Sequence, residues 1–413
     1  MDTLTHALAG ALLGEVNARP ASPGSKEGLP ASTRRGLYLS LAIVGSNLPD
    51  MDFLYSLITR SKIDYLLHHR GHTHTIIGVL LGAVLMYAVC AAWIRWRRLQ
   101  ATREEWYRIA GLALLTPLLH VAMDSTNTYG VHPFWPFNNQ WLYGDSVFIV
   151  EPLFWAAATP LLFTLQTRIA RGVAMLLMLL ASLWIFSTGL IPLVSGMFLG
   201  GVALAMLAVG YRASTRVALI TGICAWAGAT LIFILAHGVA KPRVQSFLTE
   251  RFPQARLLDQ ALSPMPVNPL CWEVIVVQME YGHYTTRRAM LSLLPSWVSG
   301  ASCPQRRLKD PTTVPLAPVA DAGAEQWQWY GQHVMPREAL ARLADSRCEV
   351  QAFLRFSRAP WGLWSAKGVI LGDMRYDREP ELGFSEIALA PTARCPTHVP
   401  PWITPVSRAL AIF

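Results

Sequence analysis

The chain contains little charge. Only 15% of its 413 residues are Asp, Glu, Lys or Arg, whereas 53% are hydrophobic. Soluble domains carry about 25% charged residues, so this composition excludes an ordinary soluble protein over the whole length. Residues Ile76–Ile94 include no charged side chain at all. A helix needs a run of about 20 apolar residues to cross the hydrocarbon core of a bilayer.

Other apolar runs repeat this pattern up to about residue 240. After Lys241, Pro, Arg and polar residues become frequent and no comparable run recurs. We therefore expect a mostly α-helical, polytopic membrane domain over residues 1–240, with about seven spans plus a short N-terminal helix, and a soluble α+β domain over residues 241–413. The expected spans are Gly36–Leu57 (interrupted), Ile76–Ile94, Ile109–Met123, Val147–Leu165, Gly172–Leu190, Ile191–Gly210 and Val217–His237, and the short helix is Leu4–Val16.

The soluble domain alternates short apolar runs with turns, which is typical of an α+β fold. No catalytic constellation stands out in it, and Asp373 and Arg375 are expected to form a surface ion pair. The pattern predicts strands at Trp272–Met279, Glu349–Phe356 and Gly368–Tyr376 and a short helix at Pro336–Ala344.

Targeting and nucleic-acid signals are also missing. No basic segment precedes the first apolar stretch, which carries Asp2 and His6, so a signal peptide is not expected. The net charge of +9 does not by itself indicate nucleic-acid binding, because many of the Lys and Arg residues lie in short loops beside the spans, where membrane orientation explains them. Zinc-finger, helix-turn-helix and RNA-binding signatures are absent. The expected partner is therefore membrane lipid and not nucleic acid.

Basic residues in short loops also indicate the orientation of the chain, because cytoplasmic loops are rich in Lys and Arg. No Lys or Arg occurs between Arg108 and Arg168, which places the Ser125–Ser146 loop outside the cytoplasm. Alternation then places the C-terminal domain in the periplasm of a bacterial-type inner membrane. The basic Arg60–Arg70 loop also falls outside and counts against this orientation. The basic connections that agree with it are Arg19 to Arg35, Arg95 to Arg103, Arg168 to Arg171 and Arg212 to Arg216.

Ionisable side chains gather in four places beside the apolar segments, where they are costly and usually functional. His120 and Asp124 are four residues apart on an expected helix, so they share one face. Imidazole and carboxylate together can hold one cation, zinc above all, with manganese or iron as alternatives. The other groups are His6 in the opening helix, Asp50 and Asp52 beside Pro49, and the run of His68, His69, His72 and His74.

Each group also has a structural explanation. His120 and Asp124 can be a hydrogen-bonded pair, Asp50 and Asp52 can be solvated at a span end, and the histidine run can be a solvated loop, although not all four of its histidines can bind one metal. The orientation argument favours a metal site, because it never used the histidines and still brings all four groups to one membrane face.

The Ser125–Ser146 loop and the start of the next span add weaker candidates, and the rigid aromatic segment Pro133–Phe137 reads as an interfacial belt. The expected metal ligands are His6, Asp50, His69, His74, His120 and Asp124, with Asp50 or Asp52 as a catalytic base. Weaker ligand candidates are Asp52, His68, His72, His132, Asp145 and Glu151.

These motifs, in this order, resemble the YdjM family, described as LexA-binding, inner-membrane-associated metal-dependent hydrolases. The resemblance covers roughly residues 1–155. Members often have Ser where Thr75 stands here and Asp where Glu151 stands. The motifs are the opening Met1–His6 with Gly10, Pro49–Asp52, His69–His74, and His120–Asp124 with Asn127 and Gly130.

The order of ligands is also distantly similar to the zinc-dependent phospholipase C and P1 nuclease group, which splits phosphodiesters with clustered zinc ions. That similarity implies that Asp124 bridges two metals beside His120, although His132 and Glu151 match the later ligands of the group only weakly. The sequence thus predicts a membrane-embedded metal-dependent hydrolase acting on a phosphoester or lipid-linked substrate at the outer face. A metal-ion transporter and a non-catalytic regulatory or structural membrane protein remain as alternatives.

The cysteines test the predicted compartment independently. Cys90 and Cys224 fall inside expected spans, and the other four fall in the C-terminal domain without Cys-x-x-Cys spacing. An even number of cysteines in a domain outside the cytoplasm predicts two disulfides, with three pairings open. Four buried free thiols in a cytoplasmic domain are the alternative. The four residues are Cys271, Cys303, Cys348 and Cys395.

Overall fold

The computed structural model divides the chain into two compact units. It describes residues 1–19, 28–304, 312–319, 325–366, 368–378, 382–392 and 395–410. The helical unit comprises Met1–Met51, His72–Trp135 and Phe148–Ile232. The sheet unit comprises Asp52–Gly71, Pro136–Val147 and Phe233–Phe413. Most of the basic connection expected between Arg19 and Arg35 lies at residues 20–27, outside the described residues.

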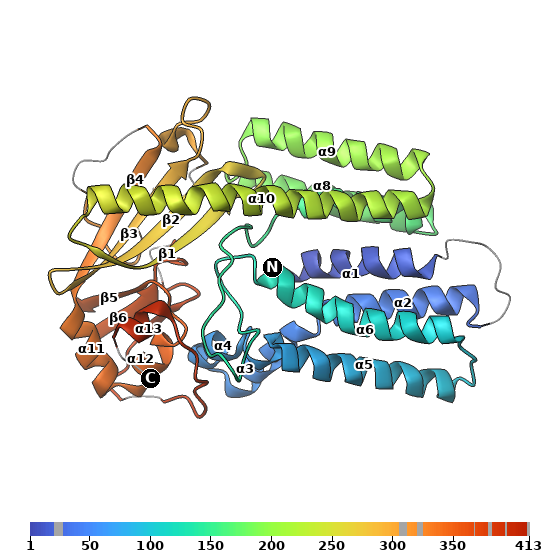
Figure 1. The fold of residues 1–413 in the computed structure, drawn as a ribbon, viewed down its shortest axis with the longest axis horizontal. Helices are drawn as coiled ribbons and strands as arrows, with labels where there is room; N and C mark the ends of the chain where they lie inside the picture. The colour runs from blue at the N-terminus through green and yellow to red at the C-terminus, as the bar shows by residue number, and fades with distance from the viewer. Residues whose placement is uncertain are drawn as a thin grey trace. The chain divides into compact units, whose positions relative to one another are not determined.

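Four helices of the helical unit lie side by side and nearly parallel (Figure 1). Three of them start at a side-chain cap, since Asp2 accepts from the Thr5 backbone N–H, Thr75 from that of Gly78 and Thr102 from that of Glu105. At Gly10 a Cβ would lie 2.5 Å from the Ala42 backbone oxygen, so only glycine permits this close approach between the first two helices. The four helices are α1 (Thr3–Ala18), α2 (Ala31–Gly45), α5 (Ile76–Trp96) and α6 (Arg103–Asp124).

Five helices among the described residues are long and apolar enough to cross a membrane. The predicted count of about seven is not confirmed, because two expected segments are interrupted. Residues 36–57 are divided at Pro49, and residues 147–165 contain Pro152 and Pro160, which begin or nearly begin short helices. Proline lacks an N–H and favours the first turn of a helix. The five are α5, α6, α8 (Arg168–Ser187), α9 (Leu193–Arg212) and α10 (Thr215–Arg251), whereas the interrupted segments are η1 (Pro49–Asp52) with α3 (Phe53–Thr59), and α7 (Pro152–Ala157) with η3 (Thr159–Thr164).

The sheet unit is built around an antiparallel four-stranded sheet in the order β1-β2-β3-β4. The end of α10 supplies Ala240, Val244 and Leu248 to a core that includes Trp272 of the sheet. The β2–β3 hairpin closes at Tyr281 and Gly282, both with positive φ, as a two-residue turn between right-twisted strands requires. The strands are β1 (Arg256–Met265), β2 (Asn268–Glu280), β3 (His283–Ser292) and β4 (Trp327–Pro336).

A second, three-stranded sheet runs in the order β5-β6-β7. The C-terminal β-sheet region is thus confirmed, with β2, β6 and α11 where a strand, a strand and a helix were predicted. The predicted strand Glu349–Phe356 is wrong, because its apolar residues Val350, Phe353 and Leu354 follow helical spacing and all are buried in a helix. The elements are α4 (Lys62–His68), η2 (His72–His74), η4 (Gly300–Ser302), α11 (Arg337–Ser346), α12 (Cys348–Leu354), β5 (Pro360–Ser365), β6 (Gly368–Asp373), β7 (Glu386–Ala388) and α13 (Pro405–Ala409).

The ion pair expected on the surface between Asp373 and Arg375 is formed, at 2.8 Å, but it is buried. Asp373 also accepts hydrogen bonds from Ser357 and from the Arg358 backbone N–H. Burial raises the pKa of the Asp373 carboxyl, but Arg375 and the Arg358 backbone N–H outweigh burial and lower it. The pair therefore belongs to the polar core of the sheet unit.

Two disulfides are present in the sheet unit, which confirms the prediction that the four cysteines pair. Cys271 of β2 is bonded to Cys303, and Cys348 of α12 is bonded to Cys395. The remaining cysteines, Cys90 and Cys224, are free. Each bond closes a loop and so restricts the unfolded chain.

Mass mapping of protein alkylated without reduction is expected to find these two pairs. Removing one by the double change Cys271→Ser and Cys303→Ser should destabilise the sheet unit by about 2–4 kcal/mol. Cys224→Ser, which removes a free thiol, is the control and should leave thermal unfolding unchanged. Alkylation of all four cysteines in unreduced protein would contradict the pairing.

Candidate metal centre

Helix ends and short 3-10 turns bring the candidate ligands to one end of the helical unit. His120 and Asp124 occupy the last two turns of α6, as their spacing predicted. Asp50 lies in η1, directly after α2, and His74 ends η2, directly before α5. Because α2 and α6 end where α5 begins, the four side chains converge on one point.

Five of the six separations among the converging atoms are 3.0–3.4 Å, and the sixth, between Asp50 and Asp124, is within 4.8 Å. The Nε2 atoms of His74 and His120 lie 3.0 Å apart, and each is 3.4 Å from Asp50 Oδ1. Asp124 Oδ2 is 3.3 Å from the first nitrogen and 3.4 Å from the second. A regular tetrahedron with edges of about 3.3 Å has its centre about 2 Å from each corner, which is the length of Zn–N and Zn–O bonds.

The outer nitrogens of the two imidazoles are held by protein oxygens. His120 Nδ1 lies 2.7 Å from the backbone oxygen of Ser46, the residue that caps α2. Since a carbonyl can only accept, Nδ1 carries the proton and Nε2 presents its lone pair to the cluster. His74 Nδ1 lies 3.1 Å from Thr73 Oγ1. Such outer hydrogen bonds orient histidines that bind metals.

Asp50 forms the accessible edge of the cluster. Its side chain is 18% exposed, whereas those of His74, His120 and Asp124 are fully buried. Burial raises the pKa of the Asp50 carboxyl, but the neighbouring His120 and His74 outweigh burial and hold the pKa well below its usual range. Asp50 is therefore an ionised carboxylate, as a metal ligand must be.

His6 contacts the cluster without belonging to the group of four. Its ring stacks on that of His120 with centroids 3.7 Å apart, and its Nε2 lies 3.3 Å from Asp124 Oδ1. The amino group of Met1 also contacts Asp124 Oδ1. One Asp124 oxygen thus faces the two other histidines while the second faces the N-terminal segment.

Two members of the histidine run lie in the sheet unit instead. His69 Nδ1 is 3.0 Å from Asp52 Oδ1, and the Arg70 backbone N–H donates to Asp52 Oδ2 at 2.8 Å. Both Asp52 oxygens therefore bind the loop that carries His69. The His68 ring makes a tilted contact with the Tyr55 ring, with centroids 4.2 Å apart, and burial lowers the pKa of its imidazole.

The remaining candidates lie outside the group of four. His72 makes an edge-on contact with the ring of Trp135 at 4.6 Å. His132 and Glu151 are buried in the helical unit, and Glu151 caps α7 by accepting from the Leu153 backbone N–H. Asp145, in the sheet unit, forms a two-pronged ion pair with Arg358, at 2.7 and 2.8 Å.

Sequence reasoning missed the residues that support the ligands. The Ser46 carbonyl could not be found, because a backbone oxygen leaves no trace in residue identity. Thr5 could have been identified from the sequence, because it belongs to the opening Met1–His6 motif. Its hydroxyl accepts from Trp155 Nε1 at 2.9 Å and also bonds to the carboxylate of Asp2. These bonds fix the first turn of α1, on which His6 stands.

Comparison with known proteins finds similarity in the N-terminal part of the chain. Residues 1–194 match the family described as YdjM inner membrane protein. The chain is also 30% identical over 142 residues to the uncharacterized protein YfhP of Bacillus subtilis (strain 168), a match that spans 34% of this chain and only 39% of that relative. No solved structure matches, and the distant similarity to phospholipase C and P1 nuclease stays a hypothesis. Residues 1–194 of this chain are therefore similar to the YdjM family of inner membrane proteins.

Proposed function

We propose that this protein is a membrane-embedded, metal-dependent hydrolase that binds zinc at Asp50, His74, His120 and Asp124. The observation that carries the proposal is the set of 3.0–3.4 Å separations among the ligand atoms of these residues. Two neutral imidazole nitrogens and two carboxylate oxygens suit zinc, which accepts mixed nitrogen and oxygen ligands in tetrahedral geometry.

A zinc ion held there would supply Lewis acidity, lowering the pKa of a water and stabilising anionic oxygens in the transition state. The protein supplies the rest. Asp50 is the accessible ligand, so water and substrate approach along its side, where a bound zinc would take the water as an additional ligand. The buried His74 and Asp124 fix the geometry. The substrate class, an amphiphilic or lipid-linked phosphoester, follows from the membrane setting and from family analogy.

We place the site and the sheet unit on the periplasmic face. The two disulfides support an oxidising compartment. The basic loop that counted against this orientation has structural uses for its charges, since Lys62 donates to the Gly383 and Glu386 carbonyls and Arg70 is buried. Residues 147–165 then cross the membrane as an interrupted segment, because α6 ends outside and α8 begins at the cytoplasmic Arg168.

The alternatives predict other arrangements. A transporter needs ligands distributed through the bilayer, whereas among the described residues groups of three or more ligands occur only between residues 50 and 124. The LexA-binding description of the family favours a regulatory protein. Such a protein would bind the metal only to stabilise its fold. It would bind zinc without turnover.

Hydrolysis of a chromogenic phosphodiester by purified protein tests the proposal. The rate should fall at least about 100-fold after chelation, because the metal provides both the nucleophile and charge stabilisation, and should return when zinc is added. Manganese and iron are added in parallel to identify the metal. A rate unchanged by chelation, or zinc-loaded protein that hydrolyses no phosphoester, would refute the proposed function.

A further inference from the structure

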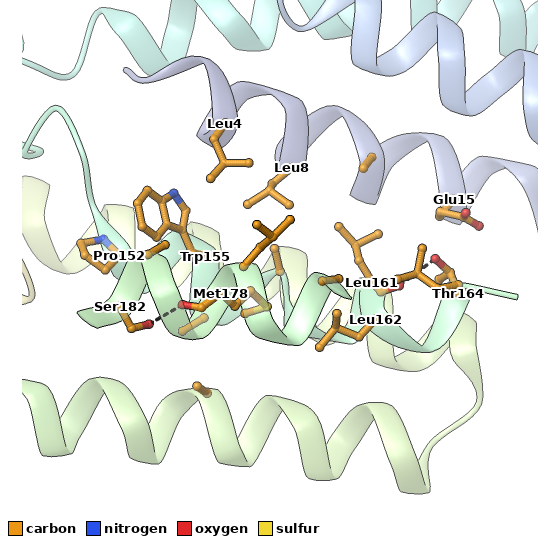
Figure 2. Close-up of a pocket in the computed structure, with 18 of the residues that line it drawn as sticks. Leu4, Leu8, Glu15, Pro152, Trp155, Leu161, Leu162, Thr164, Met178 and Ser182 are labelled. Carbon is orange, nitrogen blue, oxygen red and sulfur yellow. Dashed lines mark hydrogen bonds between the residues drawn. The ribbon is translucent and has the colours of Figure 1, made fainter. Parts of the chain in front are cut away.

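A cavity of about 640 Å³ lies inside the helical unit, lined along α1 by Leu4, Leu8, Ala11 and Glu15. Its walls come from α1 and α2 and from the helices α7, η3, α8 and α9. Figure 2 shows Leu4 and Leu8 of α1 pointing toward the segments that carry Trp155 and Met178. Two of these walls, α8 and α9, are helices long and apolar enough to cross a membrane.

The hydroxyl groups in the walls are already used within their own helices. Ser182 donates to the Met178 backbone oxygen and Thr164 to that of Leu161, each at 2.8 Å (Figure 2). A bound water needs two to four polar partners, and an apolar cavity without them stays dry. The walls therefore suit hydrocarbon and offer nothing to a polar ligand.

The cavity follows one face of α1 from Leu4 to Glu15, about 16 Å at 1.5 Å per residue. At its Glu15 end the charged side chains are paired with each other. Arg35 Nε donates to the buried Glu15 carboxylate at 2.9 Å, and Arg35 Nη2 donates to the Thr164 backbone oxygen at 3.0 Å. Since these charges satisfy each other, this end offers no unpaired charge to a lipid headgroup.

The Leu4 end lies next to the metal centre along the chain. Leu4 and Trp155 line the cavity, and the Trp155 indole donates to Thr5, the residue before His6. An amphiphile with its chain in the cavity would therefore carry its polar end at the first turn of α1, on the side where Asp124 binds His6.

We propose that this cavity binds one long hydrocarbon chain of a membrane phospholipid, with the headgroup at the Leu4 end. The apolar walls and the internally bonded hydroxyls select a hydrocarbon chain, and the paired charges at Glu15 and Arg35 leave the Leu4 end for its headgroup. The position of the headgroup beside the metal centre rests on the proposed function. Binding of the chain does not.

The test uses full-length protein in liposomes that contain phosphatidylglycerol with a photoreactive diazirine near the end of one acyl chain. After irradiation, mass spectrometry should find most of the label on α8 and η3, around Met178 and Leu161. Ala181→Trp and Ala203→Trp fill the cavity from α8 and α9. Each should cut this labelling on the order of tenfold, because every displaced methylene loses burial.

Ala88→Trp is the matched control, because Ala88 lies on the exposed face of α5, and it should be labelled like wild type. Labelling spread equally over α5 and α8, or unchanged in both cavity variants, would overturn the inference. Labelling needs no metal. Protein labelled in the cavity that hydrolyses nothing would thus support the cavity and refute the hydrolase, and hydrolysing protein without cavity labelling would do the reverse.

Discussion

Protein carrying His120→Ala or Asp124→Asn is expected to lose its metal, while wild-type protein purified without chelators holds at least one transition metal ion per chain. Even loss of an outer hydrogen-bond partner lowers metal affinity 10–100-fold, so removing a ligand should lower it by at least about 100-fold. Asp124→Asn keeps the shape of the side chain and removes its charge. Elemental analysis of the purified proteins measures the effect directly.

His68→Ala is the matched control for the metal measurement. His68 belongs to the same sequence motif as His74, but it lies in the sheet unit against Tyr55. The variant should retain the metal of wild type. Wild-type protein without metal, or His120→Ala protein with as much metal as wild type, would show that the cluster is not a metal site.

Asp50→Asn should abolish hydrolysis while the protein stays folded and inserted. Asparagine preserves the volume of Asp50 but removes the charge that balances the cation, so activation of water by the metal should be lost and the rate should fall by at least about 100-fold. Steady-state kinetics measures the loss, and thermal unfolding with metal analysis reports whether fold and metal survive.

Asp345→Asn, at an exposed position of α11, makes the same chemical change away from the site and should leave the rate unchanged. An Asp50→Asn enzyme with full activity would remove Asp50 from the mechanism. The expected pattern is a lower kcat with intact secondary structure, because Asp50 lies at the accessible edge of the cluster and not in a packed core.

Sequence spacing was most informative where regular helix placed the residues. His120 and Asp124 are four apart on α6, and both reach the cluster. In the histidine run the spacing says little, because the chain does not continue as one helix. Arg70 has φ 59°, a left-handed conformation, and the chain turns there. His69 therefore binds Asp52 in the sheet unit, whereas His74 binds the cluster.

Contacts between distant segments could not be predicted from local patterns. The sequence indicated two disulfides but left three pairings open, since only the folded sheet brings Cys271 near Cys303. Hydropathy likewise located the apolar segments, and the interruption of residues 36–57 was expected, but the break within residues 147–165 was not, because Pro152 and Pro160 do not change the average composition. The sequence predicted which segments are apolar and which cysteines form disulfides, but not the tertiary contacts between distant segments.

The hydrogen bonds that orient the two histidines of the cluster differ in their sensitivity to mutation, because His120 bonds to the backbone oxygen of Ser46. Every amino acid at position 46 has a backbone carbonyl. Unless a substitution displaces the backbone, His120 Nδ1 therefore keeps its acceptor and its proton. His74 depends on the Thr73 hydroxyl, and a single codon change can delete it. Substitutions at position 46 should therefore leave the hydrogen bond to His120 in place, whereas substitutions at position 73 can remove a hydrogen bond to His74.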